Sequence, residues 1–193
     1  MANINAPFGA RFLEDPWGFS SAGKLEPFIV DSTDATPLFV GDFVRLTGGV
    51  DQSQLCTDNQ NYGYLPIVTQ ASASSAMFIG VVEGFGVDPN QLTTIYRPAH
   101  DQRTVWVRTN PFAFFLIQTN GTALTADMGK MANIVVGSGS TRTGLSSMQL
   151  DYATVGTGTQ LKMINVDYNS SFGLYAVIKC MINLHYYKLT TFS

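Results

Sequence analysis

The sequence predicts an all-β fold: an antiparallel β-barrel or sandwich with an extended N-terminal arm and a short C-terminal tail. Glycine and proline recur at short intervals, with 18 Gly and 8 Pro in 193 residues, and short apolar or alternating runs lie between them. No stretch keeps a 3.6-residue apolar period between helix caps, and the sequence shows no repeat of fixed period.

The predicted strands follow one another along most of the chain. We expect them near residues 27–31, 37–47, 63–70, 76–85, 92–97, 103–109, 112–119, 133–137, 147–151, 159–167 and 173–185. The best helical candidate is TADMGKMAN, residues 125–133, which Gly129 weakens. These elements predict an arm over residues 1–26, a single β-rich body over 27–185 and a tail over 186–193.

The composition indicates a protein whose surface is partly covered by partners. Charged residues make up only 13 % of the chain, against about 25 % in an ordinary soluble domain. The net charge of −3 supplies no basic field for nucleic acid. No apolar run approaches the roughly 20 residues that span a bilayer. We therefore expect protein partners, and neither nucleic acid nor a membrane.

The run FAFFLIQT, residues 112–119, is apolar on both faces. Phe112, Phe114 and Leu116 share one face, and Phe115 and Ile117 share the other. Two explanations fit this pattern: a central strand beneath a second layer, or a strand with one side against another subunit.

The sequence predicts that both terminal segments are ordered, which requires contacts with the body of the protein or with a neighbouring subunit. In MANINAPFGARF, Pro7 and Gly9 break any helix, while Phe8 and Phe12 are apolar anchors. We expect this arm to reach a neighbouring subunit; the alternative is that it folds back onto its own body. The expected protein-interface residues are Asn3, Asn5, Pro7, Phe8, Phe12, Phe112, Phe114, Phe115, Tyr186, Tyr187 and Phe192.

The sequence shows no catalytic motif, and we expect no enzyme activity. His100 precedes Asp101, but no nucleophile motif accompanies the pair. The Gly-rich stretch GSGSTRTGLSS, residues 137–147, could wrap a phosphate, but it lacks the spacing of any nucleotide fingerprint. We therefore expect no catalytic, cofactor-binding or metal-binding residues. The acidic residues Asp31, Asp34 and Asp58 are interpreted as turn caps, and of the two cysteines, Cys56 and Cys180, the second is expected to be a core thiol.

Several stretches resemble one protein family. MANINAPFGARF resembles the opening of small structural proteins of tailed bacteriophages, the head decoration or cement proteins. Further similarity lies in FVGDFVRLTG at 39–48, in IGVVEGF at 79–85 and across about 103–185, which includes LTADMGKMANIVVGSGSTRTGLSSMQLD. The resemblance implies a virion protein on the capsid exterior, present in the host cytoplasm during assembly. It also implies binding to the major capsid protein and self-association as a homotrimer.

Two other functions remain open at this point. One is a tail or neck structural protein built from similar β modules. The other is a host- or glycan-binding β module, in which Trp17 and Trp106 would stack on sugar rings.

Overall fold

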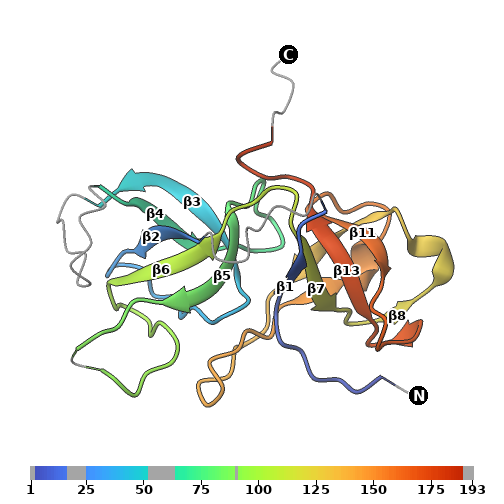
Figure 1. Ribbon diagram of the computed structural model, residues 1–193, viewed down its shortest axis with the longest axis horizontal. Coiled ribbons are helices and arrows are strands. Elements are labelled where there is room, and N and C mark those ends of the chain that lie inside the picture. The colour runs from blue at the N-terminus through green and yellow to red at the C-terminus, as the bar shows by residue number, and fades with distance from the viewer. Residues whose placement is uncertain (1–2, 17–24, 52–63, 90, 189–193) are drawn as a thin grey trace.

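The computed structural model describes residues 3–16, 25–51, 64–89 and 91–188. Over these residues the protein is all-β, as predicted, with two short 3₁₀ turns at Thr125–Asp127 and Tyr152–Thr154. Figure 1 shows two β-rich lobes side by side, one formed by the first half of the chain and one by the second.

The first lobe is a closed five-stranded barrel, called barrel 1 below. Its strand order is β2-β4-β3-β5-β6, and β2 pairs with β4 in parallel at Ile29 and Ile67. The other pairings are antiparallel. Its core contains Phe28, Val44 and Val105. The strands are β2 (Glu26–Val30), β3 (Phe43–Val50), β4 (Pro66–Gln70), β5 (Gly80–Phe85) and β6 (Arg103–Arg108).

The second lobe is a six-stranded sheet in the order β1-β7-β13-β11-β9-β10. An isolated parallel bridge between Thr119 and Leu150 joins β10, the last strand of this order, to the end of β7. The five strands from β7 to β10 in this order therefore form a barrel, called barrel 2 below. β8 (Thr122–Ala123) and β12 (Gly173–Leu174) form a separate ribbon. The six strands are β1 (Arg11–Glu14), β7 (Phe114–Gln118), β9 (Met131–Val135), β10 (Gln149–Asp151), β11 (Leu161–Val166) and β13 (Val177–Ile182).

The hydrophobic core of barrel 2 extends into the barrel 1 half of the chain, beside the separate core of barrel 1. Phe43 and Phe78 come from the barrel 1 half of the chain, yet they pack in the same cluster as Phe115 and Ile178 of barrel 2. A buried amide adds polar contacts, because the Gln160 Nε2 group donates to three carbonyl oxygens of the 72–75 loop at 2.9–3.1 Å. The predicted body over 27–185 therefore holds two barrels that pack as one unit.

The structure differs from the predicted elements in several places. The strand expected over 173–185 is interrupted between β12 and β13, because Tyr175 adopts a φ of 58°. Residues 92–97 form a loop, in which Arg97 makes an isolated bridge to Leu38. The strand expected over 37–47 begins only at Phe43, because Gly41 before it adopts a φ of 92°. The helical candidate 125–133 is a single 3₁₀ turn followed by β9, since Gly129 adopts a φ of 87°.

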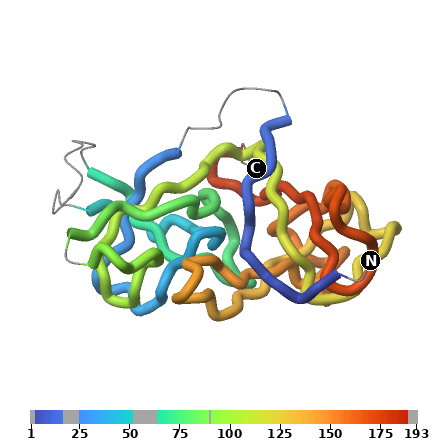
Figure 2. Tube along the Cα trace, turned by 60° about the horizontal axis from the view of Figure 1, so that its bottom comes forward, coloured from blue at the N-terminus to red at the C-terminus, as the bar shows by residue number. Residues whose placement is uncertain are grey.

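The N-terminal segment, residues 3–14, runs from the far side of barrel 2 to the junction of the two barrels and then along that junction, as the blue tube in Figure 2 shows. The Ala10 amide donates to the Gly41 carbonyl of barrel 1 at 2.8 Å. One residue later the chain enters β1, which pairs with β7 of barrel 2. Part of the predicted arm is therefore a strand of the body, and it contacts both barrels.

Candidate interaction surface

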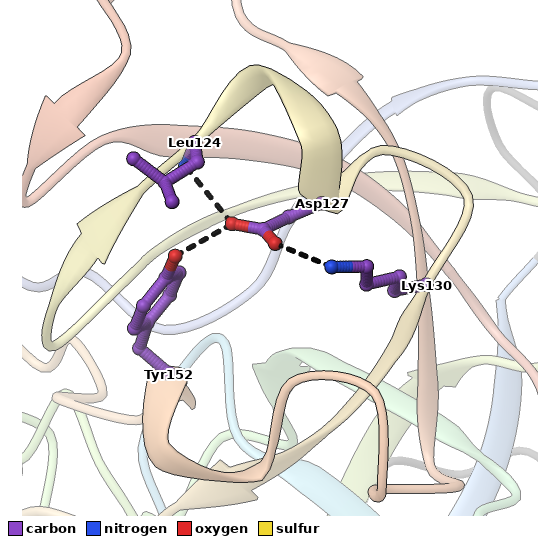
Figure 3. Close-up of polar contacts among 4 residues, drawn as sticks. All are labelled: Leu124, Asp127, Lys130 and Tyr152. Atoms are coloured by element: carbon purple, nitrogen blue, oxygen red, sulfur yellow. Dashed lines mark hydrogen bonds and ion pairs between the residues drawn. The ribbon is translucent and has the colours of Figure 1, made fainter.

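A polar cluster around Asp127 is drawn in Figure 3. Asp127 ends the first 3₁₀ turn and is buried. Its Oδ2 accepts hydrogen bonds from the Tyr152 hydroxyl at 2.6 Å and from the Leu124 amide at 2.9 Å. Its Oδ1 accepts one from Lys130 Nζ at 2.9 Å. The cluster therefore joins the β8–β9 connection to the turn after β10.

The electrostatics of this cluster suit a structural role. Burial acts to raise the pKa of Asp127, but the donors from Tyr152, Lys130 and Leu124 outweigh it and lower that pKa. Burial and the neighbouring carboxylate raise the pKa of Tyr152 to about 12, so the phenol stays protonated. Because both carboxylate oxygens hold donors, Asp127 is poorly placed to act as a base.

Tyr152→Phe is expected to destabilise the protein by about 1–2 kcal/mol, because it removes a hydrogen bond to a charged acceptor. For a chain of this size the melting temperature should fall by about 3–6 °C. Differential scanning calorimetry measures the shift. Tyr168→Phe is the matched control, since Tyr168 is 97 % exposed, and it should leave the melting temperature unchanged. Equal melting temperatures for the two variants would contradict the role given to Asp127.

The remaining polar candidates serve turns and loop packing. His100 is exposed, with a φ of 59°, and its backbone amide donates to the Asp34 carbonyl. Asp31 and Asp34 accept amide hydrogen bonds from residues two positions later, as predicted for turn caps. Asp58 lies outside the described residues. Within the described ranges, no three His, Cys, Asp or Glu side chains gather as metal ligands would.

The Gly-rich stretch 137–147 packs against barrel 1. Ser146 and Gly144 form backbone hydrogen bonds with Val40 at 2.8 and 2.9 Å. A Cβ added at Gly139 would lie 2.2 Å from the Phe39 ring, so glycine permits this close approach. The stretch therefore contributes to the contact between the barrels.

The expected N-terminal interface residues make contacts within their own chain. The Asn3 amide donates to the carbonyls of Ser171 and Leu174 at 2.8 and 3.0 Å. Phe12 packs edge-on against Phe115 and lies 3.8 Å from the Arg108 guanidinium. In this structure the segment thus folds back onto its own body. Asn5 is exposed, whereas Pro7 and Phe8 are half-buried.

The phenylalanines of the predicted two-faced strand have different environments. Phe115 is fully buried in the core of barrel 2, so its placement at an interface is wrong: the protein's own core covers that face of the strand. Phe114 is half-buried, and Lys179 Nζ lies 4.1 Å from its ring. Phe112 precedes β7 and is 38 % exposed.

The C-terminal aromatics lie near Phe112 at the junction of the barrels. Lys188 Nζ is 5.8 Å from the Phe112 ring, and Tyr186 and Tyr187 immediately precede that lysine. The two tyrosines are 39 % and 53 % exposed, and Phe192 lies outside the described residues. We call Phe112, Tyr186 and Tyr187 the junction surface. Sequence reasoning named all three residues, but it did not show that the residue after the two tyrosines, Lys188, contacts the Phe112 ring.

Buried His185 fixes the start of the C-terminal segment. Its Nδ1 accepts the Tyr187 amide at 3.0 Å, and Phe78 forms backbone hydrogen bonds with Leu184 and Tyr186. Burial and the nearby Lys188 lower the pKa of His185 to about 4, so the ring is neutral at pH 7. The junction surface is therefore held on a fixed backbone. Cys180 is a buried free thiol, as predicted, and Cys56 lies outside the described residues.

Comparisons with protein-family models, curated proteins and solved structures find no match to this chain. Among the described residues, no helix has the length and apolar character needed to cross a membrane.

Proposed function

We propose that this chain is a structural virion protein that binds the outer surface of a tailed-phage capsid and stabilises its lattice of major capsid protein. The observation that carries the proposal is the N-terminal sequence MANINAPFGARF, which resembles the start of head decoration proteins. The low content of charged residues agrees with a surface that partners cover.

The fold supports this function through its rigidity. Two barrels joined by a hydrophobic cluster that reaches from one into the other form a stiff body, and both terminal segments are fixed on it by hydrogen bonds. A protein that resists expansion of a shell needs such a body, because a flexible one would yield before load reached its contacts. We further propose that it acts on the capsid exterior as a homotrimer and is present in the host cytoplasm during assembly.

The junction surface is the part of the described chain that we assign to the contact with the major capsid protein. Aromatic side chains dominate protein interfaces because they bury much area at a low cost in side-chain entropy. Here three aromatics from two distant parts of the chain are each exposed, and Lys188, directly after the two tyrosines, lies 5.8 Å from the Phe112 ring. Buried His185 holds the backbone of the tyrosines, and Phe112 lies in the turn that leads into β7.

Cosedimentation with expanded, DNA-free capsids of the same phage tests the proposal. The triple variant Phe112→Ser, Tyr186→Ser, Tyr187→Ser should bind at least about tenfold more weakly, because aromatic interface residues each carry about 1–2 kcal/mol or more. Tyr168→Ser is the matched control, since it also removes an exposed aromatic, and it should bind normally.

Two results would contradict the proposal at different levels. Normal capsid binding by the triple variant would exclude the junction surface as the contact. Failure of the unaltered protein to bind capsids would exclude the decoration function. Binding to tail or neck assemblies, or to a glycan array, would then favour one of the alternatives.

A further inference from the structure

The two barrels have the same topology. In sequence order, β2, β3, β4, β5 and β6 of barrel 1 correspond to β7, β9, β10, β11 and β13 of barrel 2. In each barrel the first strand is parallel to the third, at Ile29–Ile67 and at Thr119–Leu150, and antiparallel to the fifth. The second strand lies between the third and the fourth in both.

The correspondence extends to individual hydrogen bonds before the second strand. In barrel 1 the Gly41 amide donates to the Val82 carbonyl at 2.8 Å; in barrel 2 the Gly129 amide donates to the Met163 carbonyl at 2.9 Å. The reciprocal bonds also match, since the amides of Val82 and Met163 donate to the residues that follow these glycines. Both glycines have a positive φ, 92° and 87°.

The fourth strand carries the same irregularity in both barrels. Its register against the fifth strand shifts between Val82 and Gly84 in barrel 1, and between Met163 and Asn165 in barrel 2. Two unrelated barrels would have little reason to share a bulge, a glycine turn and a strand order. The sequence shows no repeat, so this duplication is visible only in the backbone.

This register identifies equivalent residues on the first strands. Val107 pairs with Val82, and Cys180 pairs with Met163, so Val107 and Cys180 are equivalent. Their partners on the first strands are Glu26 and Phe115. The next residues along these strands, Pro27 and Leu116, are therefore equivalent too.

In each barrel the third strand pairs with the first strand only near the C-terminal end of the first strand. The rest of that side of the first strand has no partner within the barrel, and we call it the half-edge. In barrel 2 the Thr119 amide donates toward β13 and the Asn120 amide toward β10. Backbone groups alternate sides along a strand, so the amide and carbonyl of Leu116 face away from β13. β1 fills this half-edge, with Arg11 paired to Leu116.

In barrel 1 the equivalent half-edge has Pro27 at the position of Leu116. Among the described residues, no strand pairs with β2 there on the side opposite β6. Proline has no N–H group to donate, and proteins use it on strand edges to prevent pairing with other chains. At this position Leu116 of barrel 2 has a backbone N–H that can donate to an added strand, whereas Pro27 of barrel 1 has none.

We infer that the chain is a tandem pair of one five-stranded barrel unit, and that the half-edge of the unit's first strand is a site for an extended segment. Barrel 2 fills this site with residues 11–14 of the same chain. Pro27 closes the same site in barrel 1, so a second copy of the chain does not add its own N-terminal strand there.

The test exchanges the residues at the two equivalent positions: leucine replaces Pro27 in barrel 1, and proline replaces Leu116 in barrel 2. Pro27→Leu restores a donor on the barrel 1 half-edge and should cause self-association beyond that of the unaltered protein, measured by sedimentation velocity at increasing concentration. Pro89→Leu is the matched control, because Pro89 lies in the loop after β5, and it should sediment like the unaltered protein. A Pro27→Leu variant that also does so would overturn the inference.

A reciprocal variant tests barrel 2 on the isolated protein, independently of any capsid function. Leu116→Pro removes the donor facing β1, so trypsin should cleave after Arg11 at least about tenfold faster than in the unaltered protein. Leu116→Val keeps the donor and should protect Arg11. Protection of Arg11 in a folded Leu116→Pro variant would overturn the inference. If Leu116→Pro does not fold, the sedimentation of the Pro27→Leu variant alone tests the inference.

Discussion

Gly80→Ala is expected to abolish or severely reduce folding, with a loss of about 3 kcal/mol or more. Gly80 begins β5, and the other strands of barrel 1 close around it. A Cβ at this position would lie 2.0 Å from the Arg108 carbonyl oxygen and 2.8 Å from Val107 Cγ1. The nearest atom belongs to the backbone of the paired strand, so β6 would have to move away from β5.

Gly84→Ala is the matched control on the same strand. An added Cβ at Gly84 meets no heavy atom within 4 Å, and its φ lies outside the left-handed region. This variant should be as stable as the unaltered protein or up to about 1 kcal/mol more stable. Soluble yield and thermal unfolding by circular dichroism distinguish the two. A Gly80→Ala protein that melts within 2–3 °C (about 1 kcal/mol) of Gly84→Ala would contradict the packing described here.

Arg97→Met is expected to destabilise the protein by about 3–5 kcal/mol. The Arg97 side chain is fully buried, and its guanidinium donates to four backbone carbonyl oxygens at 2.6–2.9 Å. These carbonyls belong to Asp31, Asp34, Thr36 and Asp101. Burial lowers the pKa of the guanidinium, but the carboxylates of Asp34, Asp101 and Asp31 oppose that effect.

The expected loss of stability is large because methionine cannot replace the hydrogen bonds and the positive charge of Arg97. Four carbonyls lose their donor, and three nearby carboxylates lose a compensating charge. Arg45→Met is the matched control, because Arg45 is exposed on β3 and should change stability by less than about 0.5 kcal/mol. Chemical denaturation with guanidinium chloride measures both variants. Equal midpoints would show that Arg97 does not hold the loops at this end of barrel 1.

The sequence was sufficient for the all-β class because its signals are local. Alternation in RTVWVRT and glycines after short apolar runs are visible without knowledge of distant contacts. The same locality explains the failure at residues 92–97. LTTIYR has the composition of a strand, but Arg97 turns inward to bond four carbonyls, and tertiary contacts override strand propensity there.

The interface residues show where sequence reasoning stops. A doubly apolar strand predicts that both faces are covered, but it does not identify what covers each face. Phe115 is covered by the protein's own core and Phe114 only in part. Likewise the two glycines of IGVVEGF look alike in the sequence, and only the closeness of Arg108 to Gly80 separates them.

The attachment of the N-terminal segment determines how the fold responds to tension. Because β1 lies alongside β7, a pull along the strand axis loads its backbone hydrogen bonds in shear, all at once, instead of unzipping them in turn. The bond from Ala10 to Gly41 passes part of that force into the other barrel. A load that enters at the N-terminus is thus divided between the two barrels, so both resist it from the start.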